Sequence, residues 1–209
     1  MEGERSFFSS HMLMSFVLPA VALACGLILI TYESTDYKPN FMSSSREIAM
    51  KLIARSPKGS AVVFDFDDTL FDPQTIIETA HVGTKAYWNA DRKAIPMYKP
   101  IVEMCDVLKF AVARGMYIVL ITARPDNHIT KLTILHNFKK QRMQIHELHC
   151  NPHYPRHMNF KAKLRQKIQL QRPIVLTIGD QWGDVNESDG YDWIKLPNNR
   201  EPLMLSSLK

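Results

Sequence analysis

The segment Ala61–Leu70, which reads AVVFDFDDTL, constrains the fold of this chain more than any other. Four apolar residues run directly into acids, and such a run is typical of a strand buried on both faces of a parallel sheet. Residues two apart in an extended segment share one face, so Asp65, Asp67 and Thr69 are expected to converge at the strand's end. Clustered carboxylates repel one another unless a cation and a proton stabilise them. A strand that ends in an ordinary acidic turn is the alternative interpretation.

The rest of the sequence alternates apolar runs with segments of helical spacing. Strands are predicted at Ala61–Phe64, Tyr117–Ile121, Ile145–Cys150, Ile174–Ile178 and Trp193–Ile194, and helices at about 74–89, 99–113, 126–140 and 160–170. This alternation predicts an α/β fold with a mainly parallel sheet covered by helices on both faces. Ligands of such sheets bind beyond the carboxyl ends of the strands, so the residues that follow each strand are the candidates for function.

Three of the predicted strands lead into polar residues that suit phosphate. The first leads into DFDDT from residue 65, the second into TAR from residue 122, and the fourth into GDQWGD from residue 179. Aspartate is one of the few side chains that can attack phosphorus and become a covalent aspartyl-phosphate. Three such strand ends in one chain are much less frequent by chance than any single motif.

The set and order of these motifs resemble the haloacid dehalogenase (HAD) superfamily of phosphoryl-transfer enzymes. Its pattern is DxDx(T/V), a strand ending in Thr or Ser, a Lys or Arg, and a GDxxxD-like acidic motif; the resemblance spans about residues 60–195. The segments VLITARP, NFKAKLRQKI and TIGDQWGD are similar to the acid phosphatase branch, which includes bacterial lipoprotein phosphatases and plant vegetative storage proteins. The resemblance implies a HAD-like Rossmannoid three-layer sandwich with a mainly parallel central sheet and at most a small cap.

The resemblance also implies a division of the chemistry among named residues. Asp65 would attack phosphorus, and Asp67 would act first as general acid and then as general base. Thr122 would bind a phosphoryl oxygen and Lys161 would balance negative charge, since positioning and charge neutralisation supply most of the rate in phosphoryl transfer. Lys163 is the alternative motif lysine; Lys161 is preferred because FKAKLR from residue 160 resembles the branch's aromatic-Lys-x3-Arg pattern.

The acids of the first and last motifs are the candidate metal ligands. The resemblance implies a Mg²⁺ ion bound by Asp65, the backbone carbonyl of Asp67 and Asp180. Asp184, one helical turn beyond Asp180, would be a ligand through water or a support for the other ligands.

Two weaker signals accompany the motifs. Thr69 and Arg124 are candidates for binding the phosphate, although a structural salt bridge is an equally good interpretation of Arg124. The stretch HELHCNPHYPRH at 146–157 has nitrogen and sulfur groups that zinc favours. His149 and Cys150 would point to opposite faces of a strand, however, so a strand followed by a polar loop is favoured over a zinc site.

An apolar N-terminal stretch, MLMSFVLPAVALACGLILI at 12–30, has no charged residue and is about as long as a helix that crosses a bilayer core. A cleaved signal peptide is the alternative, because Ala22–Ala24 has the small residues of a cleavage site. The apolar run continues beyond that site and the leading segment is not positively charged, which favours an uncleaved transmembrane anchor. The predicted organisation is a tail at 1–11, an anchor at 12–31, a linker at 32–45 and a phosphatase domain at 46–209. A helix capped within 43–45 is predicted to begin the domain, with Ile48, Leu52 and Ile53 on its apolar face.

The distribution of charge bears on the orientation of this anchor. Arg5 is the only Lys or Arg before it, whereas Lys38, Arg46 and Lys51 follow it closely, which favours a cytosolic catalytic domain. A glycosylation triplet at Asn186 lies beside the acidic motif, where a glycan would crowd the site, in agreement with the cytosolic side. Secretion after signal cleavage is the alternative.

Composition limits the partners of the domain. With 26 basic and 21 acidic residues the chain carries a net charge of +5, which favours anionic partners such as phosphorylated small molecules or acidic lipid. The basic residues are scattered rather than interleaved with aromatics, so nucleic-acid binding is not expected. The expected function is a membrane-anchored, Mg²⁺-dependent phosphomonoester phosphatase that acts through an aspartyl-phosphate on Asp65. The alternatives are a protein or polynucleotide-end phosphatase of the same superfamily and, disfavoured by the intact Asp65, a non-catalytic storage or interaction protein.

Overall fold

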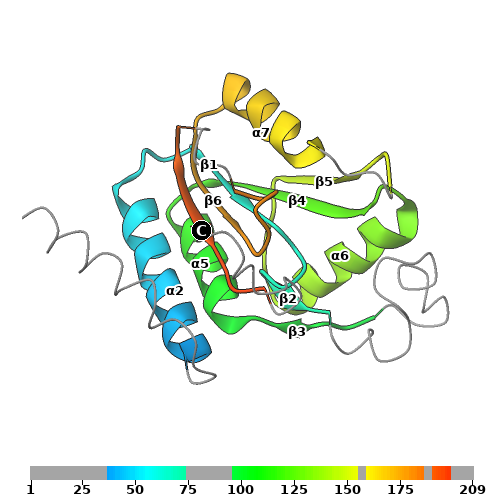
Figure 1. Ribbon diagram of the computed structural model, residues 1–209, viewed down its shortest axis with the longest axis horizontal. Helices are drawn as coiled ribbons and strands as arrows, with labels where there is room; N and C mark the ends of the chain where they lie inside the picture. The colour runs from blue at the N-terminus through cyan, green and yellow to red at the C-terminus, as the bar shows by residue number, and fades with distance from the viewer. Residues whose placement is uncertain (1–36, 74–95, 155–158, 186–189, 199–209) are drawn as a thin grey trace, which may run out of the picture. The chain divides into compact units, whose positions relative to one another are not determined.

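The computed structural model describes residues 37–73, 96–154, 159–185 and 190–198 of the chain. Its strands are β1 Ala61–Phe64, β2 Phe71–Asp72, β3 Lys99–Pro100, β4 Tyr117–Pro125, β5 Glu147–Asn151, β6 Ile174–Gly179 and β7 Asp192–Lys195. Its helices are α2 Tyr37–Arg55, α5 Val102–Ala113, α6 His128–Lys140 and α7 Phe160–Gln171 (Figure 1). Contacts divide the chain into residues 1–40 and 41–209; the first unit is described only in the opening turn of α2.

Five of these strands form one sheet, in the order β5-β4-β1-β6-β7, and every pairing in it is parallel. The central strand β1 is buried along its whole length, which is why its sequence is a continuous apolar run rather than an alternating one. The predicted α/β fold with a mainly parallel central sheet is therefore confirmed.

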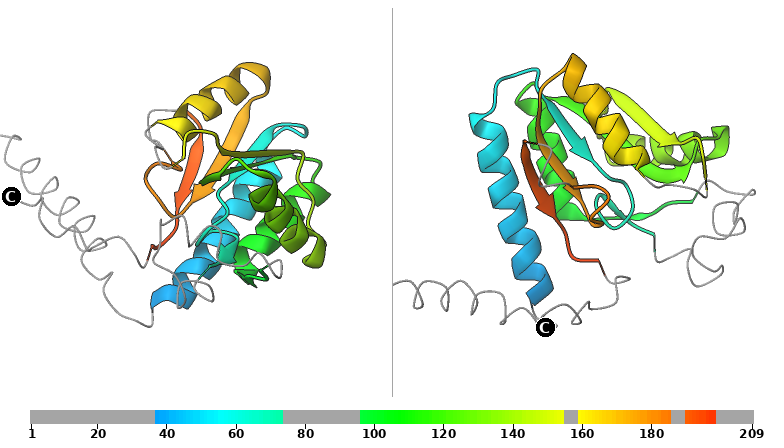
Figure 2. Two further views of the ribbon diagram at one scale, coloured as in Figure 1. Left: turned by 90° about the vertical axis from the view of Figure 1, so that its right-hand side faces the viewer. Right: turned by 45° about the horizontal axis from the view of Figure 1, so that its top comes forward.

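The sheet separates two apolar layers because successive side chains of a strand point to opposite faces. Val62 and Phe64 of β1 belong to the larger core, together with residues of α2, α5 and α6. Ala61 and Val63 belong to the smaller core, which Ile168 of α7 completes from the other face. Figures 1 and 2 show α7 on one side of the sheet and α5 and α6 on the other, which gives the three layers that the sequence predicts.

The structure corrects the ends of four predicted strands: β6 and β7 are slightly longer than predicted, and the larger changes are at β4 and β5. Strand β4 continues to Pro125, past the predicted end at Ile121, because backbone pairing with β5 continues where the apolar run stops. The register between these strands shifts between Ile121 and Pro125, as at a β-bulge, and such irregularities re-aim side chains at sheet edges. Strand β5 begins at Glu147 rather than Ile145.

Helix α2 also departs from the prediction. It begins at Tyr37, before the predicted cap within 43–45, so residues 37–45 of the predicted linker at 32–45 are helical. Phe41 and Met42 pack against the larger core, and this packing outweighs the preference of the following serines for caps and turns. On the predicted apolar face of this helix Ile53 is buried and Leu52 packs against the larger core, whereas Ile48 is exposed and the neighbouring Ala49 is buried instead.

The predicted helix at 99–113 is shorter than expected. Lys99 and Pro100 form β3, which pairs with β2 in a separate antiparallel ribbon, and the helix α5 starts at Val102. Pro100 lacks the N–H that a helix interior requires, so the helix cannot run through it. The prediction placed the helix start too early because the apolar residues that follow Pro100 have helical spacing. Cys105 and Cys150 are buried free thiols, so the bridge between them that the sequence left open is not formed.

Several predictions fall outside the described residues, namely the tail at 1–11, the anchor at 12–31, the helix at 74–89 where a small cap would lie, and the glycosylation triplet at Asn186. Within the described part of the chain, no helix combines the length and apolar character needed to cross a membrane. The anchor and the cap therefore stay predictions.

Candidate active site

The site begins where β1 ends. The Asp65 amide donates a hydrogen bond to the carbonyl of Ile178 on β6 (3.0 Å), so this residue lies at the carboxyl ends of two neighbouring strands. The side chain is almost fully buried, and burial raises the pKa of Asp65 well above its usual value. Attraction to Lys161 opposes this shift, while the nearby carboxylates of Asp184 and Asp180 add to it.

Beyond Asp65 the chain turns instead of continuing as a strand. The amides of residues 70–71 both donate to the Phe66 carbonyl, and Asp68 adopts a left-handed backbone with φ 53°, which aspartate tolerates better than most residues. The prediction of one extended segment with three side chains on a shared face is therefore wrong. The turn still keeps Asp67 close enough to Asp65 to contribute to the raised pKa of that carboxyl.

Lys161 connects the first and last motifs. Its Nζ, from the first turn of α7, donates to Asp65 Oδ1 (2.6 Å) and to Asp184 Oδ1. Burial lowers the pKa of Lys161, but attraction to Asp184 and Asp65 outweighs burial and leaves the pKa raised. The alternative lysine of the sequence motif, Lys163, is exposed on the same helix.

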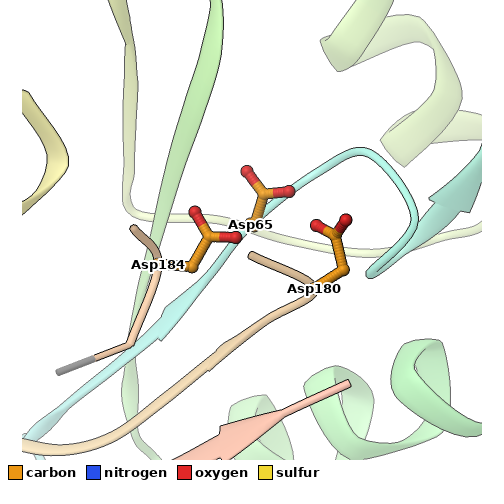
Figure 3. A group of neighbouring side chains, drawn as sticks. All are labelled: Asp65, Asp180 and Asp184. Carbon is orange, nitrogen blue, oxygen red and sulfur yellow. The ribbon is translucent and has the colours of Figure 1, made fainter. Parts of the chain in front are cut away.

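Three carboxyl groups gather beside this lysine. Asp65, Asp180 and Asp184 each offer an oxygen, and these atoms lie within 4.8 Å of one another. Figure 3 shows the first on the end of β1 and the other two on the loop that follows β6. The backbone at Gly179 makes this possible, because a Cβ atom built there would lie 2.1 Å from Asp184 Cβ. Only glycine allows Asp184 to fold back against the end of β6.

Asp180 shows why this cluster suits a cation. Its Oδ2 accepts a hydrogen bond from Asn198 Nδ2 (2.7 Å), whereas its Oδ1 is buried without a hydrogen-bond partner among the described residues. Burial, helped by Asp184 and Asp68, raises the pKa of Asp180 to about 7. An all-oxygen donor set around an unpartnered buried carboxylate oxygen fits a hard divalent cation.

Asp67, the second acid of the first motif, is held in an ion pair. Arg124 Nε donates to Asp67 Oδ2 (2.9 Å) and Arg124 Nη2 donates to Asp67 Oδ1 (2.7 Å), so both carboxylate oxygens are engaged. Burial lowers the pKa of Arg124, but Asp67 and then Tyr98 more than offset this, so the guanidinium stays charged. The structure thus places Arg124 in the salt bridge that was its alternative interpretation, and a direct contact with phosphate stays a prediction.

The two threonines of the predicted site are fully buried. Thr122 Oγ1 accepts a hydrogen bond from the Arg124 amide (3.2 Å), which places it beside the ion pair at the end of β4. The Thr69 hydroxyl has no hydrogen-bond partner in the part of the chain that the structure describes.

The sequence did not predict the roles of some residues that the structure places at the site. Buried Arg165 donates to the Gly183 carbonyl (3.0 Å) and to Tyr191 Oη (3.1 Å), which fixes the loop between the two acids of the last motif. The aromatic-Lys-x3-Arg pattern marked this arginine without assigning it a role. Asn198 and Tyr98 had no signal, because the groups that they contact lie far away in the sequence.

The histidine-rich stretch does not form a second metal group within the described residues. His149 Nε2 pairs with Glu147 Oε2 (2.7 Å), and His146 Nδ1 accepts a hydrogen bond from the Ile118 amide (2.9 Å). Both side chains therefore serve local contacts around β4 and β5, and His157 lies outside the described residues.

A parallel sheet in this order, with buried acids gathered beyond the ends of its strands, is a Rossmann-like α/β core with its site where such folds bind ligands. Residues 28–200 match the family described as HAD superfamily, subfamily IIIB (acid phosphatase). Because the match covers most of the chain, the protein belongs to this family and is a hydrolase acting on phosphomonoesters. No curated protein matches the sequence.

Solved structures show the same fold. The class C acid phosphatase from Bacillus anthracis superposes with a TM-score of 0.62 at 17% identity, over 80% of this chain and 80% of that one. The same enzyme with tungstate bound gives 0.59 at 17% identity, over 80% and 81%. A chain of the Pnkp1/Rnl/Hen1 complex gives 0.50 at 15% identity, over 68% of this chain and 47% of that one.

Proposed function

We propose that this acid phosphatase works in two steps through an aspartyl-phosphate on Asp65. The position of Asp65 carries the proposal: a buried carboxylate at the end of the central strand, 2.6 Å from Lys161 Nζ. In the first step an Asp65 oxygen bonds to phosphorus as the bond to the leaving oxygen breaks. In the second step water attacks the same phosphorus, and the Asp65 carboxylate leaves with inorganic phosphate as the product.

Asp67 moves the protons in both steps. It protonates the leaving oxygen in the first step and accepts a proton from the attacking water in the second. The ion pair with Arg124 supports this role because it fixes the orientation of the Asp67 carboxyl group. Lys161 offsets the negative charge of the phosphoryl group. Thr122 binds a phosphoryl oxygen, and Thr69 supports phosphate binding.

The proposed cofactor is Mg²⁺, held by Asp65, Asp180 and the backbone carbonyl of Asp67, with Asp184 as a supporting acid. The unpartnered Asp180 Oδ1 and the all-oxygen donor set support this choice. Lys161 carries one positive charge and cannot neutralise three buried carboxylates, so a divalent cation would balance the remaining negative charge. When bound, the ion would neutralise charge on the phosphoryl oxygens and favour the ionised form of the ligating acids.

The uncharged apolar run at 12–30 supports the further proposal that residues 12–31 anchor the domain in a membrane, on its cytosolic side. Secretion after cleavage of a signal peptide is the competing proposal. The basic net charge is consistent with a small phosphorylated substrate in either location.

The assay that tests the proposed function is hydrolysis of p-nitrophenyl phosphate by the purified protein, with and without EDTA. Activity should be lost on chelation, return with added Mg²⁺, and be absent from Asp65→Asn under all conditions. A panel of nucleotides, sugar phosphates, phosphopeptides and RNA with terminal phosphates separates a small-molecule phosphatase from its two superfamily alternatives. Activity that survives both EDTA and Asp65→Asn would contradict the proposed function.

A further inference from the structure

We propose that Tyr98 is a positioning residue that sets the orientation of the general acid Asp67 through Arg124. The inference rests on the proposed role of Asp67 in proton transfer, and it extends the active site to a residue outside every recognised motif.

The first step of the argument is that Arg124 decides how Asp67 points. A guanidinium that donates two parallel hydrogen bonds to one carboxylate fixes the plane of that group as well as its position. The Arg124 side chain is 4% exposed and the Asp67 side chain 19% exposed, so the arginine is the more deeply held partner. Any rotation of the guanidinium therefore turns the Asp67 carboxyl group with it.

The second step is that Tyr98 holds the opposite side of the guanidinium. Arg124 Nη1 donates a hydrogen bond to Tyr98 Oη (2.8 Å). The carbon atom of the guanidinium also lies 4.6 Å from the centroid of the Tyr98 ring and 4.7 Å from that of Phe66. The two rings restrict tilting of the guanidinium through cation–π contact, whereas the tyrosine hydroxyl restricts its rotation in the plane.

The third step is that Tyr98 is itself fixed by a buried side chain of α6. Its backbone amide donates to Asn137 Oδ1 (2.9 Å), and Asn137 Nδ2 donates to the carbonyls of Pro96 (2.8 Å) and Thr133 (2.9 Å). Asparagine is a poor residue for a buried helix position unless its amide is satisfied, and here both ends of the amide are. A continuous set of polar contacts therefore runs from α6 through Tyr98 and Arg124 to Asp67.

Three hydrogen bonds of the guanidinium show why this support matters. Arg124 reaches Asp67 through Nε and Nη2, so its third group, Nη1, is the one through which Tyr98 holds the plane of the guanidinium. Tyr98→Phe keeps both aromatic contacts and removes only the Tyr98 hydroxyl.

The test compares Tyr98→Phe in the full chain with Tyr117→Phe, a matched control whose hydroxyl bonds Glu147 (3.0 Å) at the amino end of β4. An alkyl phosphate such as glycerol phosphate needs protonation of its leaving oxygen, whereas p-nitrophenyl phosphate needs little. The ratio kcat/KM reports the first step, in which the leaving oxygen is protonated, whereas kcat also includes the second step, which both substrates share. Since general acid catalysis contributes about 10²–10⁴-fold, Tyr98→Phe should lower kcat/KM about tenfold for the alkyl substrate. For p-nitrophenyl phosphate kcat/KM should stay within about twofold, and Tyr117→Phe should match the parent protein on both substrates.

Two more variants separate this inference from the proposed function. Asp67→Asn should also lose more kcat/KM on the alkyl substrate, and adding Tyr98→Phe to it should cause no further loss of kcat/KM, because both changes act on proton transfer in the first step. Equal losses of kcat/KM on both substrates in Asp67→Asn would overturn the assignment of Asp67 as the acid. With that assignment upheld, equal losses in Tyr98→Phe, or additive losses in the double variant, would overturn the positioning role of Tyr98 alone.

Discussion

Charge imbalance governs the site at the scale of single residues. Three buried acids, Asp65, Asp180 and Asp184, gather in the site. Among the described residues, Lys161 supplies positive charge to two of them, Asp65 and Asp184. Buried carboxylates with too few positive partners shift towards their neutral forms, and the raised pKa values of Asp65 and Asp180 reflect this.

The two lysines of α7 provide a matched pair for testing this arrangement. Lys161→Ala removes the contacts to Asp65 and Asp184 and should reduce kcat/KM by about 10²-fold or more, as for other preorganised electrostatic groups. Lys163→Ala removes an exposed charge of the same kind and should leave kcat/KM within about twofold. Steady-state kinetics on p-nitrophenyl phosphate measures both. The reverse order of effects would show that the wrong lysine has been assigned.

Asp180 yields a prediction about pH and stability in the metal-free protein. Because folding raises its pKa to about 7, the folded state binds a proton that the unfolded state has already released at moderate pH. The stability that this proton supplies is present below about pH 4 and is lost as pH rises towards about 7.

Asp180→Asn, which cannot ionise, should therefore be more stable than the parent protein in EDTA, by roughly 1–3 kcal/mol at neutral and higher pH. Thermal unfolding measured across the pH range should show this advantage growing up to about pH 7 and then levelling off. Added Mg²⁺ should raise the Tm of the parent protein more than that of the variant. A constant difference in Tm at every pH would contradict the ionisation of Asp180 as its cause.

At the scale of helices and strands, the sequence predicted the buried strands of the sheet better than the boundaries of the surrounding elements. Strand β1 was recognisable because both of its faces are buried, and the parallel strands around it share that composition. Boundaries set by packing were missed, as at the start of α2, where Phe41 and Met42 extend the helix into a polar stretch. The short ribbon of β2 and β3 was missed because two-residue strands have no periodicity to detect.

The end of β6 gives a prediction at this scale. Gly179→Ala places a Cβ atom 2.1 Å from Asp184 Cβ, so the loop that carries Asp184 must move. Since misplaced catalytic groups cost about 10²-fold in rate, we expect a loss of this order in kcat/KM and weaker activation by Mg²⁺. Gly183→Ala, in the same loop, has no atom within 4 Å of its new Cβ and serves as the control. Equal effects of the two substitutions on activity would argue against a steric requirement at Gly179.

At the scale of the whole chain, the motifs predicted that side chains distant in the sequence meet in one site, such as Asp65 and Lys161, which are 96 residues apart. This was possible because the carboxyl ends of parallel strands meet at one edge of a sheet, so three motifs that follow strands had to converge. Residues that support the site from elsewhere could not be found this way. Tyr98 follows no predicted strand, and Asn198 lies beyond the predicted strand Trp193–Ile194 but belongs to no motif. Their contacts to Arg124 and Asp180 depend on the finished fold.

The anchor is tested at the same scale. Deletion of residues 1–36 keeps α2 intact from Tyr37 onwards and should give an active protein that does not sediment with membranes. The full chain should stay with membranes through carbonate extraction, because a span of about 20 apolar residues inserts stably. Mass spectrometry of the expressed full chain provides the decisive control. A mature N-terminus just after Ala24 would show that the signal-peptide alternative is correct.

The covalent intermediate is the central claim, and trapping it is the most direct test. Asp67→Asn should slow hydrolysis of the intermediate while still allowing attack on a substrate with a good leaving group, so the intermediate should accumulate. Acid quenching of this variant during turnover of p-nitrophenyl phosphate, followed by peptide mass spectrometry, should place the phosphate on Asp65. Phosphate on Asp67 or Asp180, or full activity of Asp65→Asn, would contradict the account.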